Sequence, residues 1–323
     1  MNRRELLSIP WLCLPAAVLA QQPARVARVV FAQNNSEGAR KRFRALFAEY
    51  GWVEGRNIAL SFVDIVEAPK AEAEARAREV VASRPDAIVI IASPEIALLK
   101  RLTKDIPIVF YNLGYDPARL GLVESVRRPG GNVTGTSLHF ERLGAKAWEM
   151  LKEILPAIKR GGVLREPIDL EDEVLRGMDS INREAWQTAA SRLGIEIREI
   201  VVPEKATLAM AEEAIRKSKS DALFISMNPP GLIAFLEKAR IPACGVRFAF
   251  ARNGGLLAVS FDWEEGDKQA VAIVARTLRG ESPAAIPVYQ HNTYGFAVNL
   301  RTARAMGITI PASIRIQATE VIE

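Results

Sequence analysis

The chain has 323 residues, of which 49% are hydrophobic and 25% charged, a composition typical of a folded protein of about two domains and unlike that of a disordered or membrane-embedded chain. Its 43 Lys and Arg against 38 Asp and Glu give a net charge of +5, and because these charges are scattered, nucleic acid is not expected as a partner. Cys13 and Cys244 are the only cysteines, and the first falls in a segment that we expect to be removed, so no internal disulfide is predicted.

The N-terminus has the pattern of a cleaved secretory signal. Arg3 and Arg4 precede a mostly apolar stretch, residues 6–20, that is too short to cross the roughly 30 Å hydrocarbon layer of a bilayer. Small or branched residues end the stretch, so residues 1–20 are predicted to be a signal peptide removed before Gln21, which implies a periplasmic location. The alternatives are a buried N-terminal helix and a lipoprotein signal, but bulky residues precede Cys13 where a lipoprotein needs small ones.

Beyond the signal, short apolar runs rich in Val and Ile alternate with amphipathic segments, which predicts strand–helix units around a parallel sheet. Apolar residues at helical spacing predict helices that include residues 43–50, 73–81 and 143–155. The predicted strands are, in chain order, 26–31, 58–65, 86–91, 106–111, 132–138, 162–164, 195–202, 221–226, 241–246 and 255–260.

An internal repeat appears when 135 is added to residue numbers. Asp86-Ala87 then falls on Asp221-Ala222, Pro94 on Pro229, and Ile106-Pro107 on Ile241-Pro242. Each copy reads as a buried strand, a proline in the first turn of a helix, and a second strand. The sequence therefore predicts an α/β protein of two doubly wound parallel-sheet lobes joined by a hinge.

The lobe boundaries follow from the repeat. We assign residues 26–138 plus 262–288 to lobe one and residues 139–261 plus 289–323 to lobe two, with three crossovers acting as the hinge. The offset between Gly51 and Gly194 is larger than 135, so we expect extra residues in lobe two, within 165–179.

Open α/β sheets bind ligands at the carboxyl ends of their strands, and two facing lobes would share one crevice there. The repeat pairs Ser93 with Asn228 and Asn112 with Arg247 across this crevice. The predicted ligand-binding residues are Asn34, Ser93, Tyr111, Asn112, Asp116, Thr136, Ser137, Arg165, Asn228 and Arg247.

Several of these residues also have a structural interpretation. Ser93, before Pro94, could help a helix N-terminus receive a carboxylate, or it could be an ordinary N-cap that stabilises the helix by about 1 kcal/mol. Arg247 could hold an acidic group in bidentate fashion or form a salt bridge between lobes. Tyr111 could stack on a ring or belong to the core.

The motifs of common enzymes are absent from the sequence. The chain has two histidines, His139 and His291, and no Gly-x-Ser-x-Gly, His-Glu-x-x-His or Gly-x-Gly-x-x-Gly motif. Residues 130–137 have the glycine spacing of a phosphate loop, but no lysine follows Gly135. We therefore predict no catalytic residues, no metal and no cofactor.

Several segments together carry a family resemblance: Gly51-Trp52-Val53-Glu54-Gly55-Arg56-Asn57, Arg128-Pro129-Gly130-Gly131-Asn132-Val133-Thr134-Gly135, and the closing Thr319-Glu320-Val321-Ile322-Glu323. In these segments the chain resembles the ABC transporter substrate-binding protein family, which includes tryptophan- and tyrosine-binding members. The resemblance implies the type I periplasmic binding protein fold. The resemblance covers nearly all residues from 26 to 323. It implies capture of a small solute, often an aromatic amino acid, between lobes that close, and delivery to a membrane permease.

One departure from the family concerns the solute. Asn228 stands where the family typically has an aspartate, and an amide cannot neutralise an ammonium group, which argues against an α-amino acid. We therefore expect a monomeric, extracytoplasmic protein that captures a small polar or aromatic solute for an ABC permease. The alternatives are a sensory or chaperone-like binding protein of the same fold without a dedicated importer, and a hydrolase or other enzyme of the α/β class whose site no motif reveals.

Overall fold

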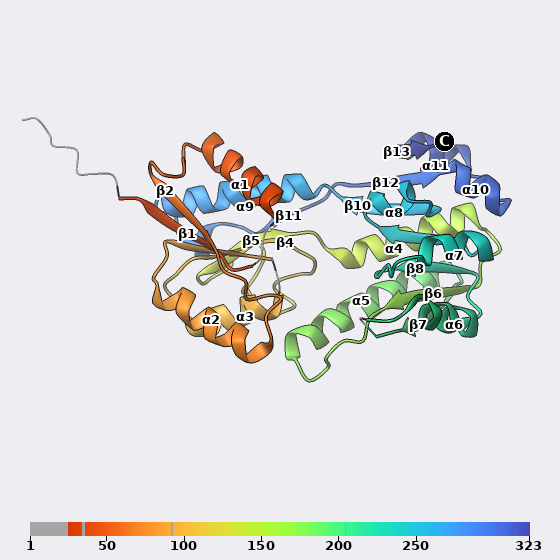
Figure 1. Cartoon of the computed structure of the whole chain (residues 1–323), viewed down its shortest axis with the longest axis horizontal. Coiled ribbons are helices and arrows are strands. Elements are labelled where there is room, and N and C mark those ends of the chain that lie inside the picture. Colours follow the sequence, from red (N-terminus) through yellow and green to blue (C-terminus); the bar gives the residue numbers. More distant parts are fainter. Residues whose placement is uncertain (1–24, 34–35, 92, 204) are drawn as a thin grey trace, which may run out of the picture.

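The computed structural model describes residues 25–33, 36–91, 93–203 and 205–323. The chain forms two α/β lobes side by side along its longest axis (Figure 1), each built on one sheet. The predicted signal peptide and Asn34 lie outside the described residues. No helix among the described residues combines the length and apolar character that a membrane span requires.

The first lobe contains a six-stranded sheet in the order β11-β5-β4-β3-β1-β2, all parallel. Its strands are β1 (Ala27–Phe31), β2 (Ile58–Phe62), β3 (Ala87–Ile90), β4 (Ile108–Leu113), β5 (Val133–Ser137) and β11 (Tyr289–Gln290). Its helices are α1 (Glu37–Glu49), α2 (Lys70–Ala82), α3 (Ser93–Leu102) and α9 (Trp263–Leu278), with the 3-10 turn η1 (Pro283–Ala285).

The second lobe contains a seven-stranded sheet in the order β13-β12-β10-β9-β8-β6-β7. Its strands are β6 (Arg160–Arg165), β7 (Glu196–Val201), β8 (Ala222–Ile225), β9 (Ala243–Val246), β10 (Leu257–Phe261), β12 (Tyr294–Asn299) and β13 (Glu320–Ile322), of which β12 runs antiparallel to β10. Its helices are α4 (Phe140–Ile154), α5 (Glu173–Arg192), α6 (Leu208–Ser218), α7 (Leu232–Ala239), α8 (Phe248–Arg252), α10 (Leu300–Met306) and α11 (Ala312–Gln317).

Helices cover both faces of each sheet, because the central strands are apolar on both sides. In the first lobe, Ile88 and Ile90 of β3 pack toward α2 and α3, whereas Val89 packs toward α1 and α9. In the second lobe, Phe224 of β8 joins the core under α4 and α5, and Leu223 joins the core under α6 and α7. The predicted doubly wound fold and all ten predicted strands are therefore confirmed.

The repeat is visible in matching hydrogen bonds. Asp86 accepts the amide of Arg28 at 2.8 Å, and Asp221 accepts the amide of Arg160 at 2.9 Å. Each carboxylate thus ties the start of its own strand to the start of the neighbouring one. Burial alone would raise the pKa of Asp221, but hydrogen bonds from the side chain of Arg160 and from the amides of Lys159 and Arg160 outweigh it and lower the pKa.

Two expectations drawn from the repeat need correction. Pro94 is the second residue of α3, as predicted, but Pro229 lies before α7, which begins only at Leu232 after Gly231 with φ +86°. The pairing of β11 with β5 places residues 289–290 in the first sheet, two residues beyond the boundary drawn at 288.

Three crossovers connect the lobes. The first follows β5 at residues 138–139, the second is Asp262 between β10 and α9, and the third is 291–293 between β11 and β12. The side chain of Asp262 accepts the amides of Glu264 and Glu265 at 3.1 Å, so α9 starts as soon as the chain enters the first lobe. Short connections of this kind suit a hinge.

Candidate ligand-binding site between the lobes

A pocket of about 580 Å³ lies at the carboxyl ends of the second lobe's strands and reaches Tyr115 and Trp263 of the first lobe. This volume is within the range of small-molecule sites, about 300–1,000 Å³. The pocket is lined by Tyr115, Phe140, Leu143, Arg165, Glu166, Ile168, Asp179, Asn182, Trp186, Phe224, Ile225, Ser226, Met227, Asn228, Val246, Arg247, Ala249, Phe250, Asn253 and Trp263.

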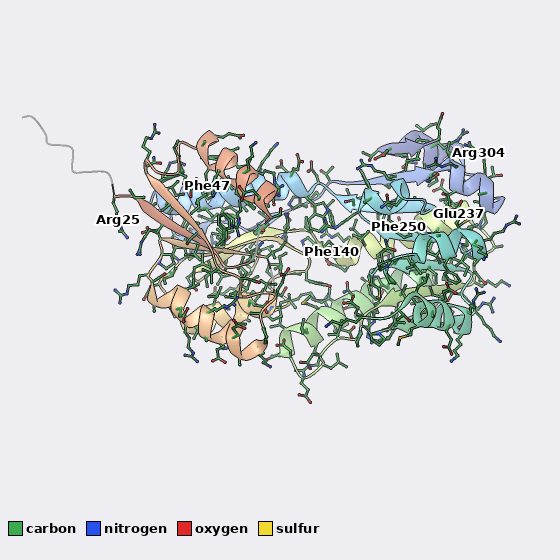
Figure 2. All side chains as sticks on the ribbon, in the orientation of Figure 1. Arg25, Phe47, Phe140, Glu237, Phe250 and Arg304 are labelled. Carbon is green, nitrogen blue, oxygen red and sulfur yellow. The ribbon has the colours of Figure 1, made fainter. Side chains whose placement is uncertain are left out.

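Aromatic rings form much of the wall. The Phe140 ring lies 5.7 Å from that of Trp263 and 6.2 Å from that of Tyr115, measured between centroids. Trp186 and Phe224 lie 6.1 Å apart on the second lobe's side. Figure 2 shows Phe140 where the two lobes meet. Such a wall favours a solute with an apolar, preferably aromatic, part.

The Trp186 indole packs directly against the backbone of Gly144 in α4. A Cβ added to Gly144 of α4 would lie 2.2 Å from Nε1 of Trp186, so α4 and α5 approach closely only because residue 144 has no side chain. Nε1 of Trp186 is buried and donates to no acceptor among the described residues. Trp186 lines the pocket, whereas this buried N–H group faces Gly144 of α4.

Arg247 is a cation at the pocket without a carboxylate partner among the described residues. It follows β9 with φ +75°, and its guanidinium carbon lies 4.2 Å from the centroid of the Trp263 ring. Stacking of this kind leaves the N–H groups at the guanidinium edge able to donate to a ligand. The alternative considered for Arg247, a salt bridge between the lobes, is not formed with any carboxylate that the structure describes.

Arg165, by contrast, belongs to a four-residue charge network. Its guanidinium lies 2.5 Å from Glu199 and 3.3 Å from Asp179, and Arg183 contacts the same two carboxylates. Arg165 and Asp179 have side chains only 9% exposed. The network joins the end of β6 to α5 and β7, so Arg165 fixes the pocket wall.

A hydrogen bond between two side chains of the pocket lining joins the lobes. Asn182 of α5 donates to the hydroxyl of Tyr115 at 2.9 Å, and the backbone oxygen of Tyr115 accepts from Ser137 at 2.8 Å. Burial, more than any other effect, raises the pKa of Tyr115, so the phenol stays neutral. On the surface nearby, Arg119 pairs with Glu184 at 2.6 Å. The long helix α5 therefore touches the first lobe, as Figure 1 also shows.

Of the predicted residues, Arg165, Asn228 and Arg247 line the pocket, and all three come from the second lobe. Ser93 does not. It is 4% exposed and shares the buried face of α3 with Ile96 and Leu99. The expected pairing of Ser93 with Asn228 across one opening is therefore not seen, because the spacing along α3 turns Ser93 toward the core.

Asn112 also lies outside the pocket. Its side-chain amide donates to Asp267 at 3.0 Å and to the backbone oxygen of Trp263 at 3.3 Å, so it anchors the first turn of α9. Asp267 in turn accepts two hydrogen bonds from Arg42 of α1, at 2.6 and 2.9 Å. Burial raises the pKa of Asp267, and the bonds from Arg42 and Asn112 partly oppose it.

The other predicted side chains interact with the protein itself. Thr136 accepts the amide of Asn112 at 2.8 Å, and Ser137 bonds to Tyr115 as described. Asp116 accepts the amide of Ala118 at 2.9 Å and closes a turn. Tyr111 is 5% exposed in the first lobe's core, where its ring meets Phe43 edge-on at 5.4 Å. These contacts give the four residues structural roles.

The sequence analysis missed most of the aromatic wall. Phe140 and Trp263 begin the helices that follow crossovers, and Trp186 lies within α5. Phe140 and Trp263 closely follow the predicted strands 132–138 and 255–260, a position that core residues also occupy, whereas Trp186 follows no predicted strand end. Their convergence depends on how the lobes are placed.

Both histidines of the chain lie at crossovers. His139 has φ +56°, and its Nδ1 is 2.9 Å from Glu141. The amide of His291 donates to the backbone oxygen of Ser137 at 2.9 Å, and its buried Nε2 has no partner among the described residues. Burial lowers the pKa of His291, opposed by Glu265 and Asp262 and assisted by His139.

Acidification from about pH 7.5 to 5.5 is therefore expected to destabilise the wild-type chain by about 1 kcal/mol more than a His291→Gln variant. Below about pH 6.5 the unfolded chain binds a proton that the native state does not. The stability associated with neutral His291 is thus complete above this pH and is lost as the pH falls toward the folded-state pKa. Urea unfolding at both pH values measures the difference, and equal losses in the two proteins would contradict it.

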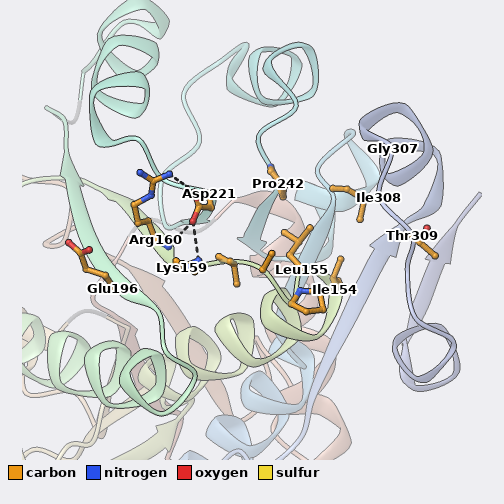
Figure 3. Close-up of a pocket in the computed structure, with 13 residues that line it drawn as sticks. Ile154, Leu155, Lys159, Arg160, Glu196, Asp221, Pro242, Gly307, Ile308 and Thr309 are labelled. Atoms are coloured by element: carbon orange, nitrogen blue, oxygen red, sulfur yellow. Dashed lines mark hydrogen bonds and ion pairs between the residues drawn. The ribbon is translucent and has the colours of Figure 1, made fainter.

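A second, larger recess of about 930 Å³ lies at the opposite edge of the same sheet (Figure 3). It is bordered by the amino ends of the strands, where Arg160 pairs with Asp221 at 2.8 Å, and by Pro156 and Ile308. The ligand crevice of an open α/β sheet lies at the carboxyl ends. The pocket between the lobes is thus the candidate site.

Comparison with known proteins agrees with this architecture. A tyrosine-binding protein of Clostridioides difficile (strain R20291) is 25% identical over 276 residues, which are 83% of this chain and 76% of the relative. A conserved domain protein from Vibrio cholerae O1 biovar eltor has a crystal structure with 27% identity and a TM-score of 0.74, over 92% of this chain and all of the other. The ABC domain from Streptococcus pneumonia in complex with L-Trp has 24% identity and a TM-score of 0.76, over 93% of this chain and all of the other.

These structures share the type I periplasmic binding protein fold. The sequence model of one family, described as ABC transporter substrate binding protein, matches residues 38–322. Proteins of this family work outside the cytoplasm, with a small-molecule ligand and a membrane permease as partners. This chain, whose two lobes enclose a pocket at the hinge, belongs to the ABC transporter substrate-binding protein family.

Proposed function

We propose that this chain captures a small solute with an aromatic ring in the pocket between its lobes and delivers it to an ABC permease. The observation that carries the proposal is the pocket itself, with aromatic side chains from both lobes and with Arg247, which stacks on Trp263 and pairs with no carboxylate in the described part of the chain. The relatives named for tyrosine and solved with L-Trp support a ring-bearing solute. The chain acts by binding and releases its solute unchanged.

Closure of the lobes completes the capture. A solute that contacts Tyr115 and Trp263 as well as the second lobe favours the closed form by the contacts that it makes only there, about 1.4 kcal/mol for each tenfold shift in population. Small-angle X-ray scattering of the monomeric protein with and without solute tests this step. A radius of gyration that does not fall on saturation with a tightly bound solute would refute closure.

The affinity for such a solute is expected to fall about tenfold or more in an Arg247→Met variant, because a charge-assisted hydrogen bond is lost. Trp186 and Trp263 line the pocket, so their fluorescence reports binding, and calorimetry gives Kd. Arg252→Met is the matched control, since Arg252 ends the helix α8 that Arg247 precedes, but pairs with Glu320 on the surface. Equal affinities in the wild type and both variants would remove Arg247 from the site.

The periplasmic location gives a further expected result. The mature protein recovered from a periplasmic extract should begin at Gln21, because the signal is cleaved after Ala20. Intact-protein mass spectrometry measures the N-terminus directly. Recovery of an uncleaved chain in the cytoplasmic fraction alone would contradict the proposal.

A further inference from the structure

The ionisable side chains of the pocket restrict the charge of its solute. Apart from the neutral phenol of Tyr115, they are Arg165, Arg247, Glu166 and Asp179. The wall therefore offers two cations and two anions, and what each can do for a ligand depends on the partners that it already has.

Asp179 is poorly placed to hold an ammonium group. One of its carboxylate oxygens faces Arg165 at 3.3 Å, and the other accepts from Arg183 at 2.7 Å. An ammonium group brought to this carboxylate would stand beside two guanidinium groups, and like charges at such distances disfavour the charged form. The side chain is also only 9% exposed, so water would screen this repulsion weakly.

Glu166 is the remaining carboxylate of the lining, and it is exposed to solvent. A hydrated carboxylate contributes little to the binding of an ammonium group, about 0–1 kcal/mol for an exposed pair. Arg247 is a cation of the lining. It pairs with no carboxylate among the described residues, and its guanidinium lies over the Trp263 ring. The pocket thus has an unmatched positive charge next to an aromatic wall.

We infer, on the basis of the proposed function, that the solute is an aromatic carboxylate without an ammonium group, of the arylacetate or arylpropionate class. Its carboxylate binds the edge of the Arg247 guanidinium, and its ring lies among Phe140, Trp186 and Trp263. A pocket of about 580 Å³ accommodates a one- or two-ring acid.

The test compares three ligands with one ring system: indole-3-propionate, L-tryptophan and tryptamine, which differ only in their charged groups. Titration calorimetry on the ligand-free mature protein is expected to show the propionate binding at least about tenfold more tightly than the amino acid, with the amine weakest. The preference should disappear in Arg247→Met and persist in Arg252→Met and Glu166→Gln.

The outcomes separate the inference from the proposed function. Tighter binding of L-tryptophan, or its loss in Glu166→Gln, would overturn the inference and leave capture of an aromatic solute intact. Absence of binding by all three ligands and by the matching phenyl series, 3-phenylpropionate, L-phenylalanine and phenethylamine, would overturn both.

Discussion

Replacing Arg165 by methionine is expected to lower the free energy of unfolding by about 3 kcal/mol, because removing one member of a buried ion pair leaves the other charge uncompensated. Arg165 contacts Glu199 and Asp179, whose side chains are 18% and 9% exposed. After the substitution Arg183, 39% exposed, is the one cation among the described residues that still pairs with the two carboxylates. Urea unfolding followed by circular dichroism measures the loss.

Arg183→Met is the control for this experiment, since Arg183 contacts the same carboxylates from the rim of the network. Its removal is expected to cost about 1 kcal/mol, in line with a partly solvated pair. If the two variants lost the same stability, burial would not be what makes Arg165 important. The network positions α5, so weaker solute binding should accompany the loss of stability in Arg165→Met.

The second large effect is expected for Gly135→Ala, which should destabilise the protein by about 3 kcal/mol through overpacking. Gly135 pairs with Phe110 in the middle of the first sheet. A methyl group there would lie 1.9 Å from the backbone oxygen of Phe110, so β4 and β5 would have to separate. Because β5 leads directly into the first crossover, the thermal midpoint and the solute affinity should both fall.

Gly131→Ala provides a matched control within the same glycine-rich run. A Cβ at residue 131 meets no atom within 4 Å, so this variant should unfold within about 0.5 kcal/mol of the wild type, as most surface substitutions do. Similar losses for residues 131 and 135 would show that the run is sensitive for a reason other than contact with β4. The sequence had suggested a phosphate-loop spacing here, and the structure shows that its second half is strand β5.

The central strands could be predicted because their signal is local. The runs around Val89 and Phe224 are apolar on both faces, and the repeated Asp–Ala start of β3 and β8 marks the same position in each lobe. By contrast, β11 and β13 have two and three residues, too few for a periodicity, and β12 breaks the strand–helix alternation by running antiparallel to β10. The start of α7 also differs from the repeat, because Gly231 ends the preceding loop in a left-handed conformation.

The sequence by itself determined the two-lobed fold and the edge of the sheets at which the candidate pocket lies, because apolar periodicity and strand polarity are properties of neighbouring residues. It could not decide which strand-end side chains face the pocket. Ser93 and Arg247 occupy comparable positions after parallel strands, yet one turns into the core and the other stacks on Trp263 from the start of α9. That difference arises from contacts between residues distant in the chain, so only the tertiary structure decided where the solute's ring and charge would lie.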